Sequence, residues 1–110
     1  MSNTRAYSPY SRKVAILLGK MINFYRKERK LTAQDLADRA GISRTTLQKI
    51  EKGDMKCEIG IVFEVASLVG IRLFDANSTS INAMEENFDN KISLLSKRIR
   101  TLKRKIDDAF

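Results

Sequence analysis

The fold is decided by residues 31–53, which read LTAQDLADRAGISRTTLQKIEKG. Thr32 precedes a helix-forming run, so its side chain can accept hydrogen bonds from the first exposed backbone N–H groups. Asp35 follows three residues later, where a carboxylate can bond back to the cap or face the positive helix end. Gly41 stands where helices often end in a left-handed residue, and the small Ala37 allows a second helix to cross closely. The stretch therefore begins with a short helix that ends at a tight turn.

A second short helix is predicted directly after this turn. Ser43 can cap its start, and Gly53 ends it. Leu47 and Ile50 share a face and are expected to point inward. The residues left pointing outward are Arg44, Thr45, Gln48 and Lys49. Two short helices joined in this way have the layout of a helix-turn-helix, in which the second helix enters the DNA major groove.

The stretch resembles the Cro/repressor type of helix-turn-helix, the XRE family. The residues that carry the resemblance are Leu31-Thr32, Leu36-Ala37, Ala40-Gly41, Ser43 and Glu51 followed by Gly53. It implies an all-α, five-helix lambda-repressor-like DNA-binding domain; the alternative is a plain helical hairpin in another bundle. One place departs from the family. A glutamine that touches phosphate commonly follows the threonine, and here that place is Ala33, with Gln34 one step later.

The resemblance also implies which side chains contact DNA. Arg44, Thr45, Gln48 and Lys49 would read bases: arginine can donate two hydrogen bonds to guanine, glutamine can pair with adenine, and a threonine methyl can touch thymine. The phosphate candidates are Thr32, Gln34, Ser43, Thr46 and Lys52. Arg26 and Glu51 are expected to form a structural ion pair. The alternative for each outward side chain is a solvated polar group that contacts nothing.

Composition narrows the class of partner. The 110 residues include 21 basic and 13 acidic ones, for a net charge of +8, which favours nucleic acid first and an anionic membrane second. Cys57 is the single cysteine and histidine is absent, so an internal disulfide, a cysteine metal site and the commonest general base are all missing. We expect no enzymatic activity, no metal and no cofactor. No apolar run approaches the ~20 residues of a membrane span and the start lacks a signal-peptide core, so a cytoplasmic, nucleoid-associated protein is expected.

The rest of the chain is expected to form a flexible arm over residues 1–8 and the DNA-binding domain over 9–76. Ser8-Pro9 is typical of a helix start, and this first helix should run to about Arg29. Its expected buried face contains Val14, Leu17, Leu18, Met21, Ile22 and Tyr25. A fourth helix is expected from about Glu58 to Val69, with the apolar residues Ile59, Val62, Phe63, Ala66 and Leu68 or Val69. Ile71–Asp75 should close the core as a fifth short helix, although its alternation fits a strand equally well.

Residues 77–80 are a linker by composition, and residues 81–110 form a basic amphipathic helix or tail. Its apolar residues alternate in steps of three and four, the a/d pattern of a helix seam: Ile92, Leu95, Ile99, Leu102 and Ile106. A parallel homodimeric coiled coil would set Arg98 against Lys103 of the other chain, like charge against like. The seam therefore favours an acidic groove on a partner protein. A basic face for DNA, an antiparallel pairing and packing against the domain remain open.

The resemblance implies a transcriptional repressor that binds, as a homodimer, double-stranded operator DNA with inverted repeats. The small domain followed by a linker and a basic tail also looks like the HipB-like antitoxins, which repress their own operon and bind a HipA-like kinase toxin. The alternatives are a stand-alone phage or bacterial repressor and a protein-interaction module on a vestigial DNA-binding fold. The outward Arg44, Thr45, Gln48 and Lys49 argue against the last of these.

Overall fold

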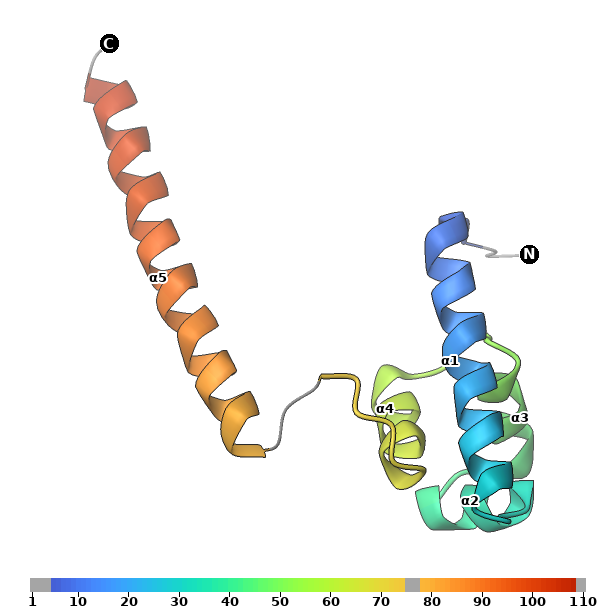
Figure 1. The fold of residues 1–110 in the computed structure, drawn as a ribbon. Coiled ribbons are helices and arrows are strands. Elements are labelled where there is room, and N and C mark those ends of the chain that lie inside the picture. Colours follow the sequence, from blue (N-terminus) through green and yellow to red (C-terminus); the bar gives the residue numbers. More distant parts are fainter. Residues whose placement is uncertain (1–4, 75–77, 109–110) are drawn as a thin grey trace. The chain divides into compact units, whose positions relative to one another are not determined.

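The computed structural model describes residues 5–74 and 78–108. Over these ranges every regular element is a helix, so the all-α class with five helices is confirmed (Figure 1). The chain divides into two compact units, Met1–Leu73 and Phe74–Phe110. The first unit holds α1 (Pro9–Glu28), α2 (Ala33–Ala40), α3 (Arg44–Glu51) and α4 (Ile59–Leu68), and the second holds α5 (Ser78–Asp108). The first four residues of the expected arm lie outside the described residues.

Local capping sets the bounds of α2 and α3, as the sequence predicts. The Thr32 hydroxyl accepts a hydrogen bond from the Asp35 N–H at 3.0 Å, and the Asp35 carboxylate accepts one from the Thr32 N–H at 3.0 Å. Gly41 ends α2 in the left-handed region with φ of 70°. Ser43 then caps α3, because its hydroxyl accepts a hydrogen bond from the Thr46 N–H at 3.0 Å. The reciprocal bonds satisfy N–H groups that a helix start leaves unpaired.

The core of the first unit is formed by side chains from all four of its helices. Its buried members are Ile22, Leu36, Ala37, Leu47, Ile50, Val65, Ala66, Val69 and Ile71. The predicted core positions Leu47 and Ile50 on α3 are 0% and 3% exposed. These residues fix α3 on the rest of the unit and leave its other face to solvent.

The buried face predicted for α1 is only partly correct. Ile22 is buried and Leu18 and Met21 pack partly against the core, but Val14 and Leu17 are 44% and 59% exposed, and Tyr25 is also exposed. The reason is length. α1 has 20 residues, or about 30 Å of helix, whereas its neighbours have eight to ten. Its first turns extend past the ends of the shorter helices in Figure 1, so their apolar side chains meet no core.

The predicted burial of Ile59 and Phe63 on α4 is wrong, since they are 69% and 44% exposed. Val65 and Val69 take the inward positions instead.

The fifth short helix predicted at Ile71–Asp75 is absent from its described part, Ile71–Phe74, which forms neither helix nor strand. Gly70 adopts φ of 87°, and the Ile71 N–H donates to the Ala66 carbonyl at 2.9 Å. This turn buries Ile71 directly, so its side chain reaches the core without a helix. Asp75 lies outside the described residues.

The fifth helix is instead α5, which begins at Ser78, inside the expected linker 77–80. Serine and threonine fit a helix start as well as a linker, so composition alone could not separate the two. The described side chains of α5, residues 79–108, are all exposed. In the described part of the chain, none of the helices has the length and apolar character needed to span a bilayer.

Candidate nucleic-acid interface

The candidate DNA-reading surface is the outer face of α3. All four predicted base-reading residues, Arg44, Thr45, Gln48 and Lys49, are exposed. With 3.6 residues per turn they share one side of the helix, opposite the buried Leu47. Two of them carry positive charge and two can hydrogen-bond, so the face offers the groups that base edges accept.

Close packing against α1 holds α3 in place. A Cβ atom at Gly19 would lie 2.6 Å from the carbonyl oxygens of both Ile50 and Glu51. A glycine at this point therefore allows the backbones of α1 and α3 almost to touch. One side-chain substitution on α1 would displace the reading helix, because backbone atoms cannot move aside as a flexible side chain can.

A buried polar cluster ties the end of α3 to α1. Arg26 Nε lies 2.7 Å from Glu51 Oε2, and Arg26 Nη2 donates to Glu51 Oε1 at 3.1 Å. Arg26 Nη1 also donates to the Leu31 carbonyl at 3.0 Å, which fixes the turn before α2. Asn23 Nδ2 donates to Glu51 Oε1 at 2.8 Å. The two residues that the resemblance pairs thus lie together in a bidentate pair.

Asn23 was missed by the sequence reasoning. The available signal was its position three residues before Arg26 on the same helix, which places both side chains within reach of one carboxylate.

The predicted phosphate residues lie at the starts of α2 and α3 and at the end of α3. Ser43 and Thr46 are joined through their hydroxyls at 2.9 Å, and Lys52 is the exposed C-cap of α3. Gln34 donates to the Asp38 carboxylate at 2.8 Å on an exposed turn of α2.

The start of α2 carries its own negative charge. The Asp35 carboxylate accepts the Thr32 N–H bond, and this backbone bond, followed by the Thr32 hydroxyl bond, lowers the pKa of Asp35 below its ordinary value. The carboxylate stays ionised where a phosphate would lie. Of the predicted phosphate positions, Thr32 is thus the least favourable electrostatically.

The comparisons with known proteins match this geometry. Residues 19–72 match the family model described as a helix-turn-helix domain. An HTH-type transcriptional regulator of Methanocaldococcus jannaschii, itself uncharacterised, is 35% identical over 54 residues, which are 49% of this chain and 82% of that relative. The chain belongs to the XRE-type helix-turn-helix family. As a member of it, the chain is a DNA-binding protein of the transcriptional-regulator class.

A solved structure of a HipB variant in complex with an O2 20mer has the same fold as this helix-turn-helix chain. Its TM-score is 0.50 and its sequence identity is 18%, over 70% of this chain and 99% of that one. At such low identity the likeness concerns the fold alone.

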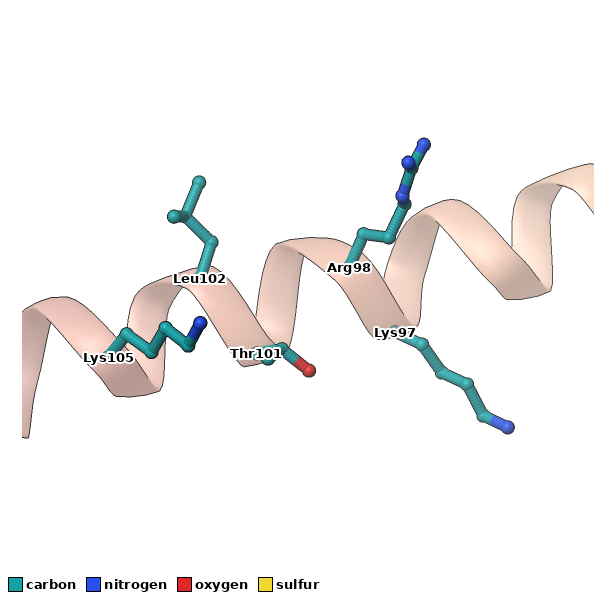
Figure 2. A pocket seen from close by; sticks show the side chains of 5 residues that line it. All are labelled: Lys97, Arg98, Thr101, Leu102 and Lys105. Atoms are coloured by element: carbon teal, nitrogen blue, oxygen red, sulfur yellow. The ribbon is translucent and has the colours of Figure 1, made fainter.

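A second candidate surface lies on α5. The seam residues Ile92, Leu95, Ile99, Leu102 and Ile106 are between 53% and 61% exposed. Figure 2 shows Leu102 pointing to the same side of the helix as Arg98, within a shallow hollow of about 370 Å³ that Lys97, Thr101 and Lys105 also line. The apolar seam is therefore bordered directly by cations.

Proposed function

We propose that the chain is a transcriptional repressor that binds double-stranded operator DNA as a homodimer, one protomer to each half of an inverted repeat. The observation that carries the proposal is the exposed polar face of α3 on a helix fixed by buried Leu47 and the Arg26–Glu51 pair. Readout of bases needs such rigid placement. Exposed apolar side chains on α1 and α4, including Leu17 and Phe63, support the dimer.

In this proposal Arg44 donates two hydrogen bonds to a guanine, Gln48 pairs with an adenine, and the Thr45 methyl contacts a thymine, with Lys49 beside them. Phosphates of the backbone are held by hydroxyl and amide side chains and one cation: Thr32, Gln34, Ser43, Thr46 and Lys52.

The test uses a duplex selected from a random-sequence library by the wild-type chain. Arg44→Ala should weaken binding to this duplex by about 1–3 kcal/mol and relax the preference at one base position. Lys52→Ala should instead weaken all sequences alike and flatten the salt dependence. Both would be measured by fluorescence anisotropy titrations. An Arg44→Ala chain with wild-type affinity and unchanged base preference would show that α3 does not read bases.

A second function is supported by α5. We infer that the apolar seam with its cationic border binds an acid-lined groove of a partner protein, and that the partner is a HipA-like kinase toxin. The chain would then be an antitoxin that represses its own operon. An exposed seam of five large apolar residues on a solvent-facing helix favours a protein partner over an isolated repressor tail. Capture of a kinase-like product of a neighbouring gene by the full chain tests this function.

A further inference from the structure

A second cationic surface lies beside the end of α3, on residues that the sequence reasoning did not connect. A shallow hollow of about 280 Å³ is lined by four cations from two distant parts of the chain, Arg5, Arg12, Lys52 and Lys56, together with the single acidic residue Asp54. We call these four cations the basic shelf. All four are exposed.

The shelf is built by the first turns of α1 and by the loop that follows α3. Gly53 has φ of 80°, and a Cβ atom there would lie 2.7 Å from the Ile16 Cα atom, so the loop presses directly on α1. The Lys56 N–H donates to the Asp54 carboxylate at 2.8 Å, which shapes the loop and engages its one negative charge. Arg5 lies over the Tyr7 ring at 5.8 Å.

Half of the shelf lies outside the part of the chain that the family shares. The family match begins at residue 19, whereas α1 begins at Pro9. Arg5 and Arg12 therefore come from an N-terminal addition of nearly three helical turns and the segment before it. The same addition supplies Ile16, which packs on Gly53. It places two cations beside a loop that already carries two.

The shelf continues the reading face of α3. Lys52 stands four residues after Gln48 and three after Lys49, so the three side chains lie on one side of the helix. Lys52 also lines the hollow. A duplex lying along the reading face would thus meet Lys52 first and then the other shelf cations.

We infer that the basic shelf binds phosphodiester groups of the DNA backbone next to the bases that α3 reads. Four cations against one engaged carboxylate give a local net charge of about +3, suited to the regular row of charges along a DNA strand. The long, exposed side chains suit phosphate, which needs charge and reach and no fitted pocket. The inference rests on the proposed function.

The experiment compares two variants that lose the same charge. Arg12→Ala with Lys56→Ala removes two shelf cations, and Lys13→Ala with Lys20→Ala removes two exposed cations of α1 outside the hollow. Binding to a random-sequence 30-base-pair duplex and to the library-selected duplex is measured from 50 to 200 mM salt. Melting temperatures confirm that each variant is folded.

The shelf variant should weaken binding to both duplexes by the same factor and reduce the log–log salt slope by about 0.9 for each lost contact in each protomer. For two contacts, the wild type should lose about tenfold more affinity than the variant across this salt range. The control variant should keep the wild-type slope.

Three results would overturn the inference, and they differ in what else they remove. A wild-type slope in the shelf variant, with Arg44→Ala still altering base preference, refutes the shelf and leaves the proposed function standing. Equal slope losses in both double variants would reduce the effect to net charge, and the shelf would not be a site. A wild-type chain that binds neither duplex would remove the proposed function together with the shelf.

Discussion

Glu51 is the residue on which three segments depend. Its carboxylate receives hydrogen bonds from Arg26 and Asn23, and Arg26 in turn binds the Leu31 carbonyl. The two charged side chains are only 10% and 9% exposed. Such a pair contributes less to net stability than its geometry suggests, because both charges lost their water, but removing one partner leaves the other buried without compensation.

Replacing Glu51 by alanine should therefore lower the free energy of unfolding by about 3–5 kcal/mol. The measurement is urea unfolding followed by circular dichroism, with the denaturant slope compared between the two chains. Glu64→Ala on the exposed side of α4 is the control and should unfold as the wild type does. A loss below about 1 kcal/mol for Glu51→Ala would mean that the cluster does not hold α3.

Two helical glycines make opposite predictions for the same substitution. Gly19→Ala brings a Cβ atom against backbone oxygens at 2.6 Å and should destabilise the fold by about 1–3 kcal/mol. At Gly60 nothing lies within 4 Å of the added Cβ atom, so Gly60→Ala should stabilise by about 0.5–1 kcal/mol through helix propensity. Thermal melts of both variants decide the matter, and equal shifts would contradict the close crossing of α1 and α3.

At the scale of the element, the cap of α2 links stability to pH. The Thr32 backbone bond and then its hydroxyl bond hold the pKa of Asp35 below its ordinary value. A group with a lowered folded pKa stabilises the fold above its unfolded pKa, near pH 4, and loses that contribution as the pH falls through the folded value.

The stability difference between wild type and Asp35→Asn should accordingly be full at neutral pH and shrink as the solution is acidified below about pH 4. Urea unfolding at a series of pH values measures it. Thr32→Ser keeps the hydroxyl bond and should reproduce the wild-type profile. A difference that stayed constant down to pH 2 would show that the carboxylate does not cap α2.

The elements that could be predicted from the sequence are those with local causes. Thr32, Gly41 and Ser43 set the bounds of α2 and α3 through bonds within a few residues, and the structure confirms them. Burial of Val14 and helix formation at Ile71 depended on what lies nearby in space. Periodicity identifies an apolar face, but it cannot show whether another element covers that face.

Most of the candidate site was predicted for the same reason. The exposed face of α3 follows from helical spacing, and the Arg26–Glu51 pair follows from the family resemblance. The basic shelf could not be predicted, because Arg12 and Lys56 meet only through the packing of Gly53 on α1.

At the scale of the whole molecule, the two units should have separable roles. A chain lacking residues 91–110 loses every seam residue from Ile92 to Ile106 but retains all of the first unit. We expect it to remain a dimer and to bind operator DNA, since α3 and its supports are intact, but to lose capture of the partner protein. Light scattering, anisotropy and pull-down measure the three properties. A monomer that still captures the partner would reverse the assignment of α5.

The exposure of α5 has a consequence for how the chain exchanges its amide hydrogens with solvent. Its described side chains contribute nothing to the buried core, so opening its hydrogen bonds requires no unfolding of the first unit. The amides around Ile22 and Leu47, in contrast, exchange only when the core opens. One chain thus contains two independent clocks, a fast one in α5 and a slow one in the helix-turn-helix unit. A protein seated on the seam would slow the first, whereas DNA on α3 would act on the second.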